Sequence, residues 1–333
     1  MNSGSGFRSF LLACLLCITL PFVSALPDGQ PVTYSFVHIS DTQSLATHYP
    51  DTYDLTFSSI ESMKEPCNIS AIIITGDVVN TWDDKKEWDA YLHARNLTTI
   101  PVYEIAGNHD TGEGDRYQYY AAYTGMPGEN YVIPVGDFDF VGINYVNKTL
   151  PQEEFTRLRE FLTGSSRSHA IIATHYYMDE EGTLSPLGED IDTHLIVKPS
   201  LVLMGHMHAD FIRKRMVGGF PTVADMTNYQ KGVPGGTTGW DYSAGTLYTV
   251  TLVKGQVETI TAQVIHFYPV PSFEEAMTAF TRNPCSLSPG DRVPVTGTSS
   301  PAHRVSFCST GGLFCSLNEF FQQCWTNIWH VFS

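Results

Sequence analysis

The chain has 333 residues, enough for one large domain or two small ones with a substantial buried core. Hydrophobic residues make up 42% of the chain and charged residues 16%, a globular balance that excludes a wholly disordered or coiled-coil protein. The formal net charge is -16, so long anionic polymers would be repelled and no wrapping of nucleic acid is expected.

Residues 1–25 have the pattern of a secretory signal peptide. A short polar start containing Arg8 leads into the apolar run 10–20, and Val23 and Ala25 are small enough for a cleavage site. The apolar run is short for a bilayer span, so a cleaved leader is favoured over a retained membrane anchor. We therefore expect a secreted or extracytoplasmic protein.

Cysteine and asparagine positions fit this export. The chain has seven cysteines, and removal of a leader carrying Cys14 and Cys17 leaves five, of which four lie in the C-terminal tail. An oxidising compartment favours disulfide bonds there, although their pairing cannot be read from the sequence. Tripeptides beginning at Asn68, Asn96 and Asn147 are candidate glycosylation sites, with chance occurrence as the alternative.

Strands and helices alternate along the middle of the chain. A hairpin over 247–253 and 257–264 indicates a mainly antiparallel region. The alternation places the chain in the α/β class. Short apolar runs predict strands at 34–39, 71–75, 102–106, 138–143, 170–174 and 201–204. Amphipathic stretches predict helices at 55–64, 85–96 and 153–163.

The composition changes near residue 271, which predicts a domain over 26–270 and a linker with a tail over 271–333. Residues 284–301 are rich in Pro, Ser, Gly and Thr, and beyond them apolar residues recur at helical spacing between 317 and 332. We expect that helix to pack on the main domain, with partner binding as an alternative. Membrane contact would involve only this helix or an uncleaved leader, and the helix lacks the Lys and Arg that meet anionic lipid.

Five polar clusters follow directly after predicted strands. Ligands bind beyond the carboxyl ends of strands in open α/β sheets, so these clusters are expected to converge on one site. Their carboxylates, amides and imidazoles form a mixed donor set suited to two divalent or trivalent metal ions. The clusters are Ser40-Asp41-Thr42-Gln43, Gly76-Asp77-Val78-Val79-Asn80, Gly107-Asn108-His109-Asp110, Thr174-His175-Tyr176 and Gly205-His206-Met207-His208.

A two-metal site needs one carboxylate that bridges both ions, and Asp77 is the candidate because Gly76 permits a tight turn beside it. In the fifth cluster an extended backbone is expected to point both imidazoles to one side and Met207 toward the core. Separate ligands are expected to complete the two ions: Asp41, Gln43 and His208 on the first, and Asn108, His175 and His206 on the second.

His109 directly follows Asn108, so it can lie above the metals near the oxygen that leaves during phosphoester cleavage. We assign it as a general acid or transition-state stabiliser. Asp110 is a candidate partner that fixes the tautomer of His109, or else the cap of a turn. No Ser, Cys or Thr nucleophile is needed, because a hydroxide that bridges the metals can attack phosphorus.

In order and spacing, the five clusters resemble those of the calcineurin-like metallophosphoesterases over about residues 32–267. The resemblance implies a four-layer α/β/β/α sandwich of two mixed sheets, and a dinuclear site at one edge where His109 assists the leaving group. The D-T-Q first motif and the exported N-terminus look most like a secreted branch of that superfamily. The resemblance also implies the ligands Asp41, Asp77, Asn108, His175, His206 and His208.

Gln43 departs from the family pattern, because many members carry D-x-H where this chain has D-T-Q. An amide oxygen is a weaker, neutral donor that favours Mn, Mg or Fe over Zn, although the histidine-rich second site still accepts Zn. The identity of the metals is left open among these four. A smaller departure is Asn80, where the family often has Asp.

The sequence therefore predicts an exported hydrolase of phosphomonoesters or phosphodiesters, with a small-molecule, lipid or polymer substrate. The alternative is a noncatalytic surface or adhesion module that keeps the fold and a structural metal, which Gln43 and the unexplained tail leave open. Tyrosines at 117, 119, 120, 123, 176 and 177 are candidates for an aromatic rim around the substrate, with core packing as the other reading.

Overall fold

The computed structural model describes residues 30–112, 116–144, 150–209, 211–227, 243–254, 256–267 and 293–294. The expected leader, and the tail apart from two residues, lie outside these ranges. The domain limits 1–25, 26–270 and 271–333 and the terminal helix therefore stay predictions. Among the described residues, no helix combines the length and the apolar character needed to cross a membrane.

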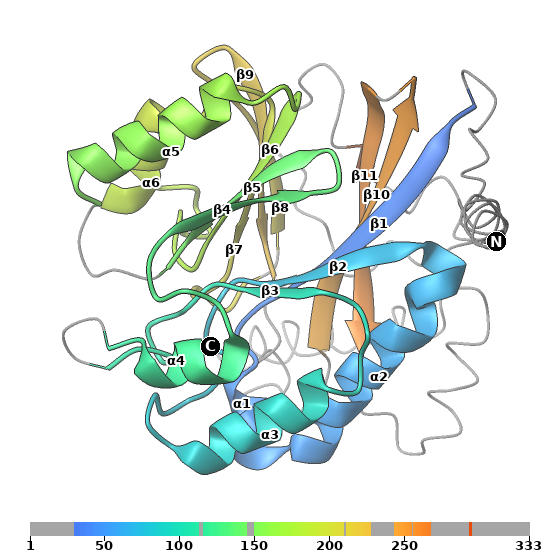
Figure 1. Cartoon of the computed structure of the whole chain (residues 1–333), viewed down its shortest axis with the longest axis vertical. Helices are drawn as coiled ribbons and strands as arrows, with labels where there is room; N and C mark the ends of the chain where they lie inside the picture. The colour runs from blue at the N-terminus through green and yellow to red at the C-terminus, as the bar shows by residue number, and fades with distance from the viewer. Residues whose placement is uncertain are drawn as a thin grey trace, which may run out of the picture.

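The described chain forms two six-stranded sheets with helices on their outer faces (Figure 1). The strand order is β12-β11-β10-β1-β2-β3 in the first sheet and β4-β5-β6-β7-β9-β8 in the second. The strands of the first sheet are β1 (Val32–Ile39), β2 (Ile69–Ile74), β3 (Val102–Glu104), β10 (Ser243–Val253), β11 (Gln256–Phe267) and β12 (Val293–Pro294). Those of the second are β4 (Tyr131–Val135), β5 (Phe138–Ile143), β6 (His169–Thr174), β7 (Ser200–Met204), β8 (Phe211–Val217) and β9 (Phe220–Met226).

Both sheets are mixed. In the first, β1, β2 and β3 are parallel, whereas β10 runs antiparallel to β1 and β11. In the second, β5, β6, β7 and β9 are parallel, while β4 and β8 pair antiparallel at the edges. The parallel strands end on the same side of each sheet, which is where the polar clusters follow.

Helices cover the two outer faces and complete four layers (Figure 1). Apolar side chains such as Phe57 and Trp88 fill the space between the first sheet and its helices, and Leu158 and Ile191 do so for the second. The first sheet is covered by α1 (Gln43–His48), α2 (Pro50–Cys67), α3 (Lys85–Arg95) and α4 (Gln118–Thr124), and the second by α5 (Gln152–Gly164) and α6 (Pro186–His194).

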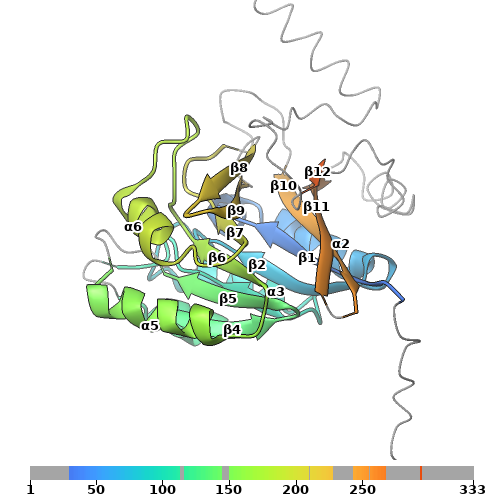
Figure 2. The same ribbon diagram turned by 90° about the horizontal axis from the view of Figure 1, so that it is seen from above.

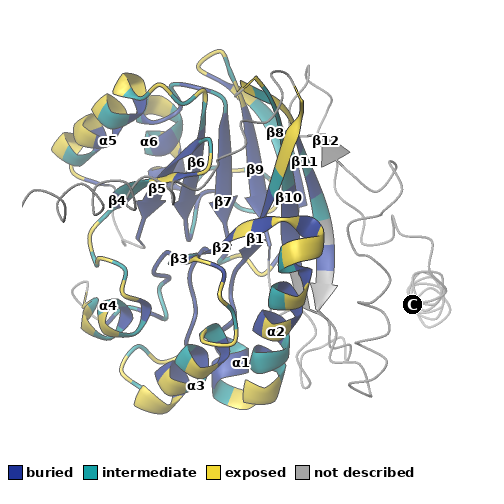
Figure 3. Cartoon of the chain, turned by 45° about the vertical axis from the view of Figure 1, so that its right-hand side comes forward, coloured by how far each residue is buried: buried dark blue, intermediate teal, exposed yellow. Residues whose placement is uncertain are grey.

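The two sheets face each other across a third apolar layer. Phe36 of β1 stacks on Tyr248 of β10 with ring centroids 4.7 Å apart, and it meets Phe138 of β5 edge-on at 6.0 Å. Figure 3 shows the central strands largely buried, with exposed residues on the helices, on the connecting loops and on β11. The expected α/β/β/α sandwich is confirmed.

The predicted strands and helices are present, within a few residues at most ends. The longest difference is α2, which begins at Pro50 rather than near residue 55 because a proline suits the first turn of a helix. Residues Val293–Pro294, expected within a linker, form the edge strand β12 (Figure 2). No sequence pattern had predicted α1, α4, α6, β4 or β9.

Candidate metal centre

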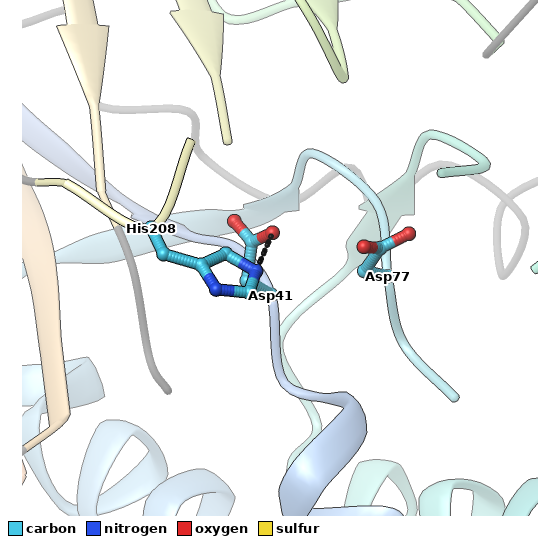
Figure 4. A group of neighbouring side chains, drawn as sticks. All are labelled: Asp41, Asp77 and His208. Carbon is cyan, nitrogen blue, oxygen red and sulfur yellow. Dashed lines mark ion pairs between the residues drawn. The ribbon is translucent and has the colours of Figure 1, made fainter. Parts of the chain in front are cut away.

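Three ionisable side chains meet where β1, β2 and β7 end. One ligand atom from each of Asp41, Asp77 and His208 lies within 4.8 Å of the others. Figure 4 draws these three side chains. The Nε2 atom of His208 is 3.5 Å from Oδ1 of Asp41. Gln43 joins them, since its Nε2 donates to Oδ2 of Asp77 at 3.2 Å. The structure thus brings together the group predicted for the first metal with the predicted bridge.

A second group lies on the other side of Asp77. The Nε2 atom of His175 is 3.3 Å from Oδ2 of Asp77, 3.0 Å from Oδ1 of Asn108 and 3.2 Å from Nδ1 of His206. That Nδ1 is itself 2.9 Å from Oδ1 of Asn108. The other ring nitrogen of His175 donates to the backbone carbonyl of Thr75 at 2.7 Å, which turns Nε2 toward the site.

Backbone hydrogen bonds tie the clusters to one another. The N–H of His206 donates to both carboxylate oxygens of Asp41 at 3.0 Å, and the N–H of His109 donates to Oδ1 of Asp77 at 3.0 Å. The N–H of Asp41 donates to the carbonyl of Gly76 at 3.0 Å. All five clusters are therefore connected, and the convergence expected from their strand positions is observed.

The backbone of four candidate ligands lies in the left-handed region. The φ angles are 57° for Asp41, 53° for Asp77, 73° for His206 and 49° for His208. Such conformations cost about 1–3 kcal/mol each for residues other than glycine and gather at functional sites. The extended backbone expected for the fifth cluster is thus wrong, and Met207 is 37% exposed instead of facing the core, because positive φ angles break the alternation of side chains.

Two glycines leave the room that the carboxylates occupy. A Cβ on Gly107 would lie 2.2 Å from Oδ1 of Asp77, and one on Gly205 would lie 2.3 Å from Oδ2 of Asp41. Non-bonded carbon and oxygen atoms do not approach so closely, so any larger residue would displace these carboxylates. The sequence analysis named both glycines within the clusters without assigning them this role.

Gln43 is the best test of whether the site fits a metal. Its side chain is 2% exposed, and its Oε1 makes no hydrogen bond to any described residue. A buried polar oxygen without a partner is costly, and a cation would satisfy it. The donor set of carboxylate, amide and imidazole groups therefore fits metal ions, with Gln43 as an oxygen donor.

The electrostatics of the group also favour positive charge. Burial alone would lower the pKa of His175, but the carboxylate of Asp77 raises it to about 9. A hydrogen bond to Asp41 raises the pKa of His208, whereas burial and the nearby His175 lower the pKa of His206. Although burial opposes ionisation of Asp77, His175 holds the pKa of that carboxyl below its ordinary value. The carboxylates thus stabilise cationic charge beside them.

Asp110 does not orient the ring of His109. Its Oδ1 accepts the backbone N–H groups of Val78 and Val79, and its Oδ2 accepts that of Gly107. Burial, followed by repulsion from Asp77, raises the pKa of Asp110 to about 7. Of the two interpretations of Asp110, the cap of a turn fits these hydrogen bonds and the partner of His109 does not: Asp110 holds the turns that carry the candidate ligands.

The ring of His109 is instead fixed by a backbone carbonyl. Its Nδ1 lies 2.8 Å from the carbonyl oxygen of Asn80, to which an Nδ1–H donates. The sequence analysis treated Asn80 as a substituted family position, and no sequence signal identifies a carbonyl as a partner. This hydrogen bond leaves Nε2 of His109 as the ring nitrogen available for proton transfer.

The expected aromatic rim is largely core. Tyr120 and Tyr177 are fully buried, and Tyr117, Tyr119 and Tyr123 pack against the core between the first sheet and its helices. Among the described ring contacts, one of the six tyrosines meets a candidate ligand. The ring centroid of Tyr176 lies 4.7 Å from that of His206.

Comparison with known proteins decides the family. The family model described as calcineurin-like phosphoesterase matches residues 34–210, more than half of the chain. The chain belongs to the calcineurin-like phosphoesterase family. The matched segment contains all five clusters.

This calcineurin-like phosphoesterase is similar in sequence to one curated protein and in fold to solved structures. The chain is 31% identical over 199 residues to the uncharacterized protein YvnB of Bacillus subtilis (strain 168), covering 53% of this chain and 15% of that protein. The purple acid phosphatase PPD1 from yellow lupin (Lupinus luteus) seeds matches with a TM-score of 0.51 and 14% identity, covering 72% of this chain and 52% of that one. The 5'-nucleotidase from Candida albicans matches with a TM-score of 0.49 and 11% identity, over 76% of this chain and 54% of that one. The chain thus spans a small part of its curated relative and about half of the lupin enzyme, whose likeness shows the shared fold.

Proposed function

We propose that the chain is a metal-dependent phosphoesterase that hydrolyses phosphomonoesters or phosphodiesters. The observation that carries the proposal is the convergence of side chains from five strand ends around Asp77. Neighbouring donor atoms lie 2.9–3.5 Å apart, and those of Asp41, Asp77 and His208 lie within 4.8 Å of one another. Carboxylate, amide and imidazole donors gathered so closely, at the cost of strained backbone, are characteristic of a metal centre. Membership of the calcineurin-like phosphoesterase family supports the same chemistry.

The residues around Asp77 divide into two sets of donors. Asp77 would lie between the ions and contact both. When bound, a metal pair supplies an activated water at neutral pH and neutralises charge on the phosphoryl group. The open Oε1 of Gln43 supports a first site with oxygen donors, which suits Mn, Mg or Fe, while the imidazoles of the second site also suit Zn. The two proposed sets are Asp41, Gln43 and His208 for one ion and Asn108, His175 and His206 for the other.

His109 is the proposed proton donor to the leaving oxygen. Its backbone N–H is held by Asp77, which keeps the residue beside the metal centre. Its ring is held by the carbonyl of Asn80, which fixes the proton on Nδ1 and makes Nε2 the donating atom when the ring is protonated. Asp110 would act on catalysis through the backbone turns that it binds.

We also propose that the chain is exported with cleavage of residues 1–25 and carries disulfide bonds in its tail. The polar start, the apolar run 10–20 and the small residues near 25 support a leader. Two of the three candidate glycosylation asparagines, Asn68 and Asn96, are exposed. Expression of the full chain in a secreting host, followed by N-terminal sequencing, tests this proposal; an N-terminus at residue 1 would overturn it.

The proposed activity is tested with metal-free, leader-free protein reconstituted separately with Mn, Fe, Zn and Mg. We expect at least one metal to support hydrolysis of an aryl phosphate or a bis-aryl phosphate. His208→Ala should lower kcat/KM by about 100-fold, because an ion loses a ligand from its shell. Its matched control is His93→Ala, which removes an imidazole that is 70% exposed on α3 and should leave the rate unchanged.

A folded protein that turns over neither ester with any of the four metals would contradict the proposal. That result would favour a noncatalytic module that keeps the fold. Preference for the monoester or the diester would narrow the substrate class.

A further inference from the structure

Two buried carboxylates hold four consecutive backbone N–H groups after Asp77. Oδ1 of Asp110 accepts those of Val78 and Val79, at 2.8 and 3.0 Å. Oε2 of Glu87 accepts the next two, from Asn80 at 2.7 Å and from Thr81 at 2.8 Å. The first carboxylate belongs to a predicted cluster, whereas Glu87 lies on α3 and belongs to none.

Glu87 is in the first turn of α3, where a glutamate commonly caps the helix that contains it. Here Asp84 caps the helix by accepting the N–H of Lys86 at 2.8 Å, and the N–H of Asp84 itself donates to the carbonyl of Thr81. The carboxylate of Glu87 is therefore directed at the preceding loop. It is 6% exposed, and the hydroxyl of Thr47 on α1 donates to its Oε1 at 3.0 Å.

The loop that Glu87 holds carries the acceptor for His109. The N–H of Asn80 is bound by Glu87, and the carbonyl of Asn80 binds Nδ1 of His109 at 2.8 Å. Rotation of either peptide group next to Asn80 would therefore release one of these two hydrogen bonds. The backbone of Asn80 thus links the His109 ring to a carboxylate that does not contact the ring.

We propose that Glu87 is a positioning residue for His109, acting through the Asn80–Thr81 backbone. The inference rests on the proposed function, because it assigns Glu87 to the proton-donation step. Without Glu87, two backbone donors lose their partners and the Asn80 carbonyl is free to turn toward solvent. The His109 ring then loses its fixed direction while the metal ligands keep theirs.

This role predicts an effect that depends on the leaving group. Proton donation by a positioned side chain contributes about 10²–10⁴-fold to a reaction that needs it. An alkoxide leaves poorly without a proton, whereas a nitrophenolate leaves readily. Loss of positioning should therefore slow alkyl esters much more than nitrophenyl esters.

The test measures kcat for phosphoesters with leaving groups from nitrophenol to simple alcohols. Glu87→Met should reduce kcat by about 10- to 100-fold on alkyl esters and by less than about 3-fold on nitrophenyl esters. His109→Ala should also slow alkyl esters more than nitrophenyl esters. Glu87→Gln should restore the wild-type dependence, because its amide oxygen can accept both N–H groups and its amide N–H can donate to Thr47.

Glu61→Met is the matched control, because Glu61 also binds a loop from a helix. Its Oε2 accepts the N–H of Thr99 at 2.8 Å and the hydroxyl of Thr98 at 2.7 Å, and neither loop residue touches the metal centre. This variant should leave the leaving-group dependence unchanged. If Glu87→Met does not fold, Thr47→Val removes the hydroxyl that orients Glu87 and should shift the dependence in the same direction by a smaller factor.

Equal slowing of all esters by Glu87→Met, or no slowing of any, would overturn the inference. So would a Glu87→Gln variant that behaves like Glu87→Met. In these cases the wild type is active and the proposed function stands. A wild type inactive on every ester would overturn the proposed function, and this inference with it.

Discussion

At the residue scale, the metal centre depends on backbone as much as on side chains. Asp41, Asp77, His206 and His208 all have positive φ angles, which direct their side chains toward a common point. Hydrogen bonds from neighbouring clusters to Asp41 and Asp77 offset the strain. That these residues gather at one site could be predicted from the sequence, because chemistry restricts the side-chain types that suit a metal. Their backbone strain and the carbonyl partners of His109 and His175 could not, since any residue type supplies a carbonyl.

Gly107→Ala should cost about 100-fold in kcat/KM, because a displacement of about 1 Å at a catalytic site has that effect. The new Cβ would lie 2.2 Å from Oδ1 and 2.3 Å from the backbone nitrogen of Asp77, so a side-chain rotation cannot relieve it. Gly164→Ala is the control, with nothing within 4 Å of the added carbon. Steady-state kinetics and a thermal melt on both variants check this; an active Gly107→Ala would show that Asp77 tolerates the shift.

At the element scale, a buried polar network joins the two sheets next to the metal centre. Nδ1 of His38 on β1 is 2.7 Å from Oδ2 of Asp225 on β9, and its Nε2 is 2.9 Å from the hydroxyl of Thr75. Asp225 also accepts the hydroxyl of Thr246 on β10 at 3.2 Å. The carbonyl of Thr75 in turn holds His175, so the network supports a candidate ligand from behind.

Breaking this network should destabilise the fold strongly. His38→Ala and Asp225→Ala should each lower the free energy of unfolding by about 3–5 kcal/mol, because each leaves a buried polar partner unsatisfied. The double variant should cost less than the sum of the two. Denaturant unfolding of the four proteins of this double-mutant cycle measures the coupling between the two side chains. The exposed pair Lys85–Asp89 is the control and should show little coupling, because solvent screens it. If the losses in unfolding free energy from His38→Ala and Asp225→Ala were strictly additive, the two side chains would not stabilise the fold as a pair.

Strong apolar periodicity made most strands and long helices predictable, as in the buried β2 and the amphipathic α5. Short elements escaped prediction for a physical reason. The helix α1 has six residues and α4 has seven, too few turns for a periodic pattern to emerge.

At the scale of the whole molecule, stability should depend on pH through one buried carboxyl. Burial raises the pKa of Glu104 to about 7, although the ion pair with Arg95 and the hydrogen bond from Tyr91 both lower it. A folded pKa above the unfolded one means that the folded state binds the proton more tightly. The contribution of this proton to the free energy of unfolding is complete below about pH 4.5 and is lost as the pH rises through about 7.

Glu104→Gln removes this titration and keeps an acceptor for Arg95. The stability of the wild type relative to this variant should fall by up to about 3 kcal/mol between pH 4.5 and 7.5, since one pKa unit corresponds to about 1.4 kcal/mol. Urea unfolding of both proteins across this range gives the difference and cancels groups common to both. A difference that does not change with pH would show that Glu104 is ionised throughout.

The most direct test of the dinuclear centre is metal analysis of the reconstituted, leader-free protein and its Asp77→Asn variant. We predict two metal ions per wild-type chain, and at most one in the variant, because the bridging carboxylate has become a neutral amide. Asp89→Asn, which changes an exposed carboxylate on α3, should still bind two. One ion or none in the wild type, or two ions retained by Asp77→Asn, would contradict the account.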